Sequence, residues 1–293
     1  MSDNFIKPLG SLAVPEFFVI SSFLFFIKAR KNGFSFDVLW NFLKRLVLLY
    51  LFWVIVWLPI ILIQNDYGKE GIINGVGFFV RDFFFGHTFD ASWFLGALIT
   101  GMPIVWLLGK YLKEKLAWVV PLIIYLYLRY QSLLPICWQK PYQIYSSFQP
   151  PYHSFLGGML WLSIGYYLSN SVILGKLKGA KNIYAWLGFW GGFIIMVCDI
   201  VPVVPMVLCV IVLFIASYMW KLPDYSVLYK RFRTYSILFY VIHDSFKKIP
   251  KQLFGWENGP LLFFITLLVC FIASEIIIRM KDIKGFNWLR FAY

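Results

Sequence analysis

Long apolar stretches constrain the fold of this chain more than any other feature of its sequence. Each is close to the roughly 20 residues that a helix needs to cross a bilayer. Nine can be read, over approximately residues 9–27, 41–63, 92–109, 116–134, 153–174, 182–200, 202–220, 234–250 and 260–278. The chain is 60% hydrophobic and only 14% charged, whereas about 25% of an ordinary soluble domain is charged. We therefore predict an all-α, polytopic transmembrane helix bundle with about nine spans.

One further segment, residues 71–85, mixes glycine and aromatic residues with Arg81 and Asp82. Adjacent charges in so short a segment disfavour a lipid-embedded span. We expect this segment to lie on the membrane surface or to re-enter the membrane.

The basic residues predict the orientation of the spans. The formal net charge is +13, from 27 basic and 14 acidic residues. If the N-terminus is outside, most of the basic residues fall in the linkers that face the cytoplasm, as the positive-inside rule requires. We therefore predict an outer N-terminus and a cytoplasmic C-terminus. Because topology accounts for the charge, we expect membrane lipids and not nucleic acid as partners.

The four cysteines lie inside or at the ends of apolar stretches and form no close pairs in the sequence. They are Cys137, Cys198, Cys209 and Cys270. Neither metal-ligand spacing nor a disulfide framework is visible in them. We expect them to pack in the interior, and we expect no metal site.

Five short strings, in order along the chain, carry a resemblance to a known family. They are VPEFFVISSFL (14–24), KRLVLLYLFW (44–53), SWFLGAL (92–98), GGMLWLSIGYYL (157–168) and FYVIH (239–243). They resemble the motifs of the acyltransferase-3 family of integral membrane O-acyltransferases, written VPxFFxISGF, a basic entry into the third span, LWFLxAL, FxxGYYL and xYLIH. The resemblance covers nearly the whole chain.

The chain also departs from the family pattern at several positions. Family members usually have ten spans, and this chain resembles spans two to ten. The family's first span, which carries an arginine and the histidine regarded as the catalytic base, has no counterpart. Phe42 stands where the family has its first third-span arginine, Ser22 where glycine is usual and Glu16 where an apolar residue is usual. We expect residues 1–293 to form a single acyltransferase-like domain that lacks this first span.

By resemblance, the expected function is O-acylation at a membrane. The family typically moves an acyl group, here expected to be acetyl, from cytoplasmic acyl-coenzyme A to a hydroxyl of a cell-envelope glycan or lipid-linked sugar. Acyl-coenzyme A would be a co-substrate, and no bound cofactor is expected. The usual setting is the bacterial inner membrane. Two alternatives stay open, namely a transporter or flippase for a glycan or lipid intermediate, and an inactive truncated family member.

Acyl transfer to a hydroxyl needs a base, and histidine suits this role near neutral pH. The chain has three histidines, namely His87, His153 and His243. The 13 residues between Arg233 and Lys247 make only about 20 Å of helix, short of the roughly 30 Å hydrocarbon core. The helix must continue and carry His243 and Asp244 into the membrane. We predict both as catalytic residues; the alternative is a neutral histidine that joins two helices by a hydrogen bond.

Glu16 is the third catalytic candidate, because it lies inside the first apolar stretch directly after Pro15. A carboxyl group at this position could supply a polar group at the outer mouth of a transfer pathway. The alternative is a side chain at the membrane interface, in contact with lipid headgroups or a neighbouring lysine.

Candidate donor and acceptor contacts complete the predicted site. Lys44 and Arg45 match the family's basic motif at a cytoplasmic helix start and are predicted to bind the phosphates of acyl-coenzyme A; plain membrane anchoring is the alternative. Tyr152 belongs to an aromatic and proline-rich outer segment, residues 138–153, that could stack on a sugar. Tyr152, His153 and Trp93 are predicted to contact the acceptor, and an interfacial aromatic belt is the alternative.

Overall fold

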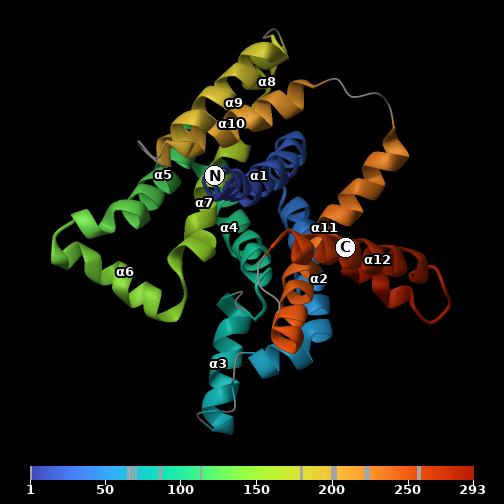
Figure 1. Ribbon diagram of the computed structural model, residues 1–293. Helices are drawn as coiled ribbons and strands as arrows, with labels where there is room; N and C mark the ends of the chain where they lie inside the picture. Colours follow the sequence, from blue (N-terminus) through green and yellow to red (C-terminus); the bar gives the residue numbers. More distant parts are fainter. Residues whose placement is uncertain are drawn as a thin grey trace. The chain divides into compact units, whose positions relative to one another are not determined.

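A computed structural model gives the fold. It describes residues 2–293 except 65–66, 68, 70, 86–87, 113, 179–180, 199–202, 221–224 and 256–258, and it leaves out the side chains of residues 2–7, 63–64, 115, 178, 203 and 252–254. The described part of the chain is almost entirely helical and contains no β-strand (Figure 1). The prediction of an all-α fold is therefore confirmed.

The helices belong to two compact units, Met1–Leu43 with Ala97–Leu222 and Lys44–Gly96 with Pro223–Tyr293. The first unit contains α1 (Ser2–Lys31), α5 (Glu114–Tyr130), η1 (Gln131–Leu133), α6 (Ile136–Phe148), η2 (Pro151–His153), α7 (Phe155–Leu168), α8 (Ser171–Lys178), α9 (Asn182–Val197) and α10 (Val203–Met219). The second contains α3 (Ile72–Phe85), α11 (Ser226–Phe254), α12 (Pro260–Met280) and η3 (Asn287–Ala292). Two helices, α2 (Phe36–Gln64) and α4 (Ser92–Tyr111), pass from one unit into the other.

Local sequence explains where several of these helices begin and end. The Ser154 hydroxyl caps α7 by accepting a hydrogen bond of 3.2 Å from the Leu156 amide, which satisfies a donor that the first helical turn leaves unpaired. Gly255 ends α11 with a left-handed φ of 64°, a conformation that glycine adopts at little cost. Gly33, with φ of 60°, adopts the same left-handed conformation after the end of α1.

The core of the first unit is a parallel contact between α1 and α7. The Ser22 hydroxyl donates to the Leu162 carbonyl, and further along both helices Arg30 contacts Ser169. Gly165 allows the closest approach, because a Cβ atom there would lie 2.5 Å from the Val19 carbonyl oxygen. Small residues let membrane helices pack this closely, where van der Waals contact drives association.

The other helix pairs run in the directions that alternate membrane crossings require. Tyr125 of α5 packs edge-on against Trp161 of α7 while Glu114 reaches Asn170, so these two helices are antiparallel. Gly188 and Gly192 make the corresponding antiparallel contact between α9 and α10. The same holds in the second unit for α11 and α12.

The predicted stretches and the observed helices agree in position. Among the described residues, five segments are long and apolar enough to cross a membrane, namely Pro8–Lys31, Phe36–Leu62, Ser92–Tyr111, Leu116–Leu133 and Pro260–Met280. Three shorter apolar helices, Phe155–Leu168, Asn182–Val197 and Val204–Met219, lie within the fifth, sixth and seventh stretches. The fifth stretch was predicted as one span over residues 153–174, but α7 ends at Leu168 and α8 begins at Ser171. The eighth stretch lies within the longer and more charged α11. The count of nine spans and the side on which each terminus lies remain predictions.

Candidate active site

His243 lies on α11 in the second unit, and its ring orientation is fixed by the helix itself. Its Nδ1 atom is 3.0 Å from the Phe239 carbonyl oxygen and 2.9 Å from that of Tyr240. Carbonyl oxygens only accept hydrogen bonds, so Nδ1 must carry the proton and donate it. Nε2 is therefore the nitrogen at which a neutral His243 can take up a proton.

Asp244 places a carboxylate beside this second nitrogen. The distance from His243 Nε2 to Asp244 Oδ2 is 3.4 Å, and both side chains are half-buried. At this distance the pair is too long for a strong hydrogen bond, and the carboxylate lies beside the ring nitrogen that carries no proton. The two predicted catalytic residues thus lie side by side, and the carboxylate faces the nitrogen that would act as a general base.

Aromatic side chains from α2 and α4 hold this part of α11. The Trp57 indole nitrogen donates to the Val241 carbonyl at 3.2 Å, and the Trp57 ring packs edge-on against Phe246. From α4, the Phe94 ring contacts Tyr240 with ring centroids 5.0 Å apart. The turn that carries His243 is therefore clamped by bulky rings, which fix side-chain position well.

Trp93, the predicted acceptor contact, belongs to the first turn of α4 and is partly buried. It precedes Phe94, whose ring packs against Tyr240 one turn before His243. Trp93 and the histidine thus belong to the same unit, on helices that touch each other. Sequence separation hides this relationship, because it depends on how α4 meets α11.

The predicted donor cations lie on the α2 part of the same unit. Lys44 and Arg45 are both exposed. Arg45 lies close enough to Arg233 of α11 for the two guanidinium groups to repel each other, and neither has a carboxylate partner among the described residues. Two neighbouring cations without an acidic partner are suited to binding an anion, with arginine favouring phosphate.

The first unit holds Glu16, whose surroundings differ from those of His243. Both carboxylate oxygens of Glu16 are buried and have no hydrogen-bond partner among the described side chains and backbone. Phe18, two residues further on, packs against Gly158 near the start of α7. Glu16 is therefore at the end of the unit where α7 begins. A buried carboxyl group without a partner is costly, which marks the position as unusual.

Tyr152 and His153 lie at this same end, in η2 directly before α7. The Tyr152 hydroxyl donates to the Leu128 carbonyl at 2.6 Å, and burial raises the pKa of this hydroxyl above its ordinary value, so that it stays protonated near neutral pH. The proton of this hydroxyl is thus donated within the fold, and the ring of Tyr152 remains for a ligand to stack on. The His153 side chain is exposed. His87 lies outside the described residues.

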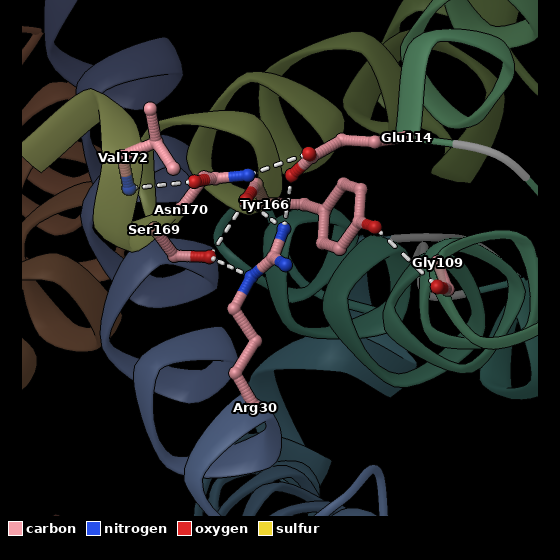
Figure 2. Close-up of polar contacts among 7 residues, drawn as sticks. All are labelled: Arg30, Gly109, Glu114, Tyr166, Ser169, Asn170 and Val172. Carbon is pink, nitrogen blue, oxygen red and sulfur yellow. Dashed lines mark hydrogen bonds and ion pairs between the residues drawn. The ribbon is translucent and has the colours of Figure 1, made fainter.

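A polar cluster that was not predicted from the sequence lies at the opposite end of the first unit (Figure 2). Arg30 Nη2 is 2.6 Å from Glu114 Oε1, and Arg30 Nε donates to the Ser169 hydroxyl at 3.0 Å. Asn170 donates to the second oxygen of Glu114 at 2.5 Å, and the Arg30 guanidinium lies 4.5 Å from the centre of the Tyr166 ring. The cluster joins α1, α5 and α7. Only the charge of Arg30 was visible in the sequence, where it contributed to the topology signal.

Apolar helices of membrane-spanning length define the class as integral membrane proteins. Comparison with known proteins gives the family. A family model described as an acyltransferase domain matches residues 2–280. The chain therefore belongs to the acyltransferase-3 family.

Other comparisons add little. An amino-acid racemase of Enterococcus faecalis is 25% identical over 122 residues, which cover 42% of this chain. The matched segment spans only 16% of the racemase, so racemase activity is a property of that protein and is not transferred to this chain. No solved structure matches the chain.

Proposed function

We propose that this protein transfers an acyl group, acetyl in the first instance, from cytoplasmic acyl-coenzyme A to a hydroxyl of a cell-envelope glycan or lipid-linked sugar in the bacterial inner membrane. The observation that carries the proposal is the state of His243. Its Nδ1 proton is committed to two backbone carbonyls, and its Nε2 atom faces a carboxylate at 3.4 Å. A general base for hydroxyl activation needs an unprotonated ring nitrogen held in a fixed orientation, and Nε2 of His243 meets this requirement.

The chemistry of the proposed step is simple. The acceptor hydroxyl oxygen attacks the thioester carbonyl carbon while Nε2 of His243 takes the hydroxyl proton. The carbon–sulfur bond then breaks, and the departing coenzyme A thiolate receives that proton from the imidazolium. Asp244 lies beside the nitrogen that takes the proton, whereas the carboxylate of a Ser–His–Asp triad contacts the opposite ring nitrogen; Asp244 would accept a hydrogen bond from the imidazolium between the two proton transfers.

The placement of the cations fits a thioester donor. Arg233, beside Arg45, precedes His243 by ten residues on α11, which corresponds to about 15 Å along the helix axis. The pantetheine arm of coenzyme A separates its diphosphate from its thioester. Phosphates held at Arg45 and Arg233 would therefore leave the arm free to extend along α11 towards His243.

The test is transfer of label from acetyl-coenzyme A, radiolabelled in the acetyl group, to envelope extract by the purified chain in detergent. We expect label in the glycan fraction with the wild-type protein, and a loss of about 100-fold or more with His243→Ala, which is the usual contribution of general-base catalysis. Lys247→Gln, which changes an exposed cation one turn further along the same helix, should transfer label normally.

Two results would count against the proposal. Full transfer by a well-folded His243→Ala variant would remove this histidine from the chemistry. Movement of the acceptor across a vesicle membrane without any label transfer would instead favour the transporter interpretation.

A further inference from the structure

A pocket of about 450 Å³ lies between the beginning of α11 and the end of α12 in the second unit. Its lining is unusually basic, with four cationic side chains and one acidic one. The polar lining residues are Lys230, Arg231, Thr234, Arg279, Lys281 and Tyr293, and Asp282 supplies the single carboxylate. A volume of this size is within the range of small-molecule sites.

Two of the cations are held in place across the pocket by one carboxylate. Glu275 of α12 accepts from Arg231 of α11 and, at 3.0 Å, from Arg279 Nε. A guanidinium group has five donors, so each arginine keeps further N–H groups available. The terminal amino groups of Arg279 have no partner among the described residues. Glu275 therefore positions two guanidinium groups without using up their capacity to bind an anion.

The two lysines are not neutralised by any acid that the structure describes. Lys281 Nζ lies 5.2 Å from the centre of the Tyr293 ring, and Lys230 has no carboxylate within ion-pair distance in the described part of the chain. Lys230 also lies in the second turn of α11, where a cation opposes the helix dipole. Its position there does not serve the stability of the helix.

An unsatisfied polar atom gives an independent sign of a ligand. The Tyr293 hydroxyl is buried and has no hydrogen-bond partner among the described residues, although Tyr293 lines the pocket. A buried hydroxyl without a partner costs free energy, and such groups call for an explanation. A ligand oxygen would remove this cost if the Tyr293 ring turned its hydroxyl into the pocket, because the hydroxyl oxygen has almost no accessible surface in the structure.

We propose that this pocket binds a phosphate group. The oxygens of a tetrahedral phosphate group can accept hydrogen bonds from guanidinium, ammonium and phenol donors at the same time. The negative charge of the phosphate offsets the cationic lining. The phosphate could come from the adenosine bisphosphate part of a coenzyme A donor, a source that rests on the proposed function, or from the headgroup of an anionic phospholipid. None of these residues belongs to the donor pair predicted from the sequence.

The test is direct binding to the purified full chain in neutral detergent, by calorimetry. The probes are adenosine 3′,5′-bisphosphate and short-chain phosphatidylglycerol, with short-chain phosphatidylcholine as the zwitterionic comparison. The decisive variant is Lys230→Gln with Lys281→Gln, which leaves the Glu275 ion pairs intact. Loss of two lysine–phosphate attractions should weaken binding about 30-fold. Lys230→Arg with Lys281→Arg should restore it, and Lys247→Gln should not change it.

The outcomes distinguish the two possible sources of the phosphate. They also distinguish this inference from the proposed acyltransferase function. Lysine-dependent binding of the nucleotide identifies the donor, and lysine-dependent binding of phosphatidylglycerol alone identifies a lipid headgroup. Equal affinity of the wild-type protein and the double glutamine variant for both probes, or no binding of either probe to the wild-type protein, would overturn the inference. Binding needs no turnover, so a chain that binds phosphate here but transfers no acyl group would refute only the proposed function.

Discussion

Arg30 and Glu114 form an ion pair that closes one end of the first unit, although 83 residues separate them in the sequence. Their side chains are 25% and 32% exposed, and 2.6 Å separates Arg30 Nη2 from Glu114 Oε1. The pair lies at the end of α1 where basic residues gather, so that a cation expected to anchor the membrane topology has a structural role as well.

Removal of this pair should destabilise the protein. We expect Arg30→Ala to lower the free energy of unfolding by about 2 kcal/mol, the contribution of hydrogen bonds to charged groups, and to lower the thermal midpoint in detergent. Lys28→Ala, which changes an exposed cation on the same helix, should have little effect. In a double-mutant cycle, Arg30→Ala combined with Glu114→Ala should cost less than the two changes added. Simple additivity would show that the pair is not coupled.

Gly165→Ala should disrupt the contact between α1 and α7. The new Cβ atom would meet the Val19 carbonyl oxygen at 2.5 Å, and backbone atoms in a packed core move only at a cost of about 1–3 kcal/mol. Gly175→Ala on α8 is the matched control, because nothing lies within 4 Å of that Cβ position and alanine favours a helix. We expect a lower yield of folded protein for the first variant and an unchanged or higher thermal midpoint for the second.

Tyr152 allows acceptor binding to be separated from folding. Tyr152→Phe removes the hydrogen bond to Leu128 and should lower the free energy of unfolding by about 1 kcal/mol. Because the variant retains the aromatic ring, its KM for the acceptor should be unchanged. Tyr152→Ala should raise that KM by about 2- to 12-fold if the ring stacks on a sugar. Tyr130→Ala tests the aromatic-belt alternative with an exposed tyrosine nearby. Equal effects of the two alanine variants on the KM would favour the belt.

Arg45 is expected to contribute to the binding of the acyl-coenzyme A donor. Loss of one charge-assisted contact to phosphate, worth about 1.5 kcal/mol, predicts that Arg45→Gln raises the KM for acetyl-coenzyme A about tenfold with little change in kcat. Lys28→Gln removes a cation from another helix end with the same expected topology role. If the two variants change the KM alike, Arg45 serves only as a membrane anchor.

Much of the helix layout could be predicted from the sequence, because a span needs little more than length and apolarity. The stretches at 92–109 and 260–278 differ from α4 and α12 by only two residues at their ends. The helical form of α6 was not predicted, since its segment is rich in proline and aromatic residues. It is held partly by the Tyr127 hydroxyl, which donates to the Trp138 carbonyl at 2.8 Å.

The candidate site was predictable only in part. The adjacency of His243 and Asp244 is written in the sequence, and the depth argument drew attention to both. The partner of each ring nitrogen of His243 cannot be read from the sequence, because it depends on the rotamer that the helix imposes. The basic pocket was not predicted from the sequence for a related reason. Its cations come together only through the register of α11 against α12, which Glu275 fixes and linear charge counting cannot detect.

The parallel contact of α1 with α7 has a consequence for biosynthesis. More than 120 residues separate the end of α1 from the start of α7, and at 5–20 residues per second the ribosome needs roughly 6–24 s to make them. During that interval the face of α1 that later meets Gly165 has no native neighbour. The Ser22 hydroxyl, which in the finished fold donates to the Leu162 carbonyl, is without that partner for the same interval.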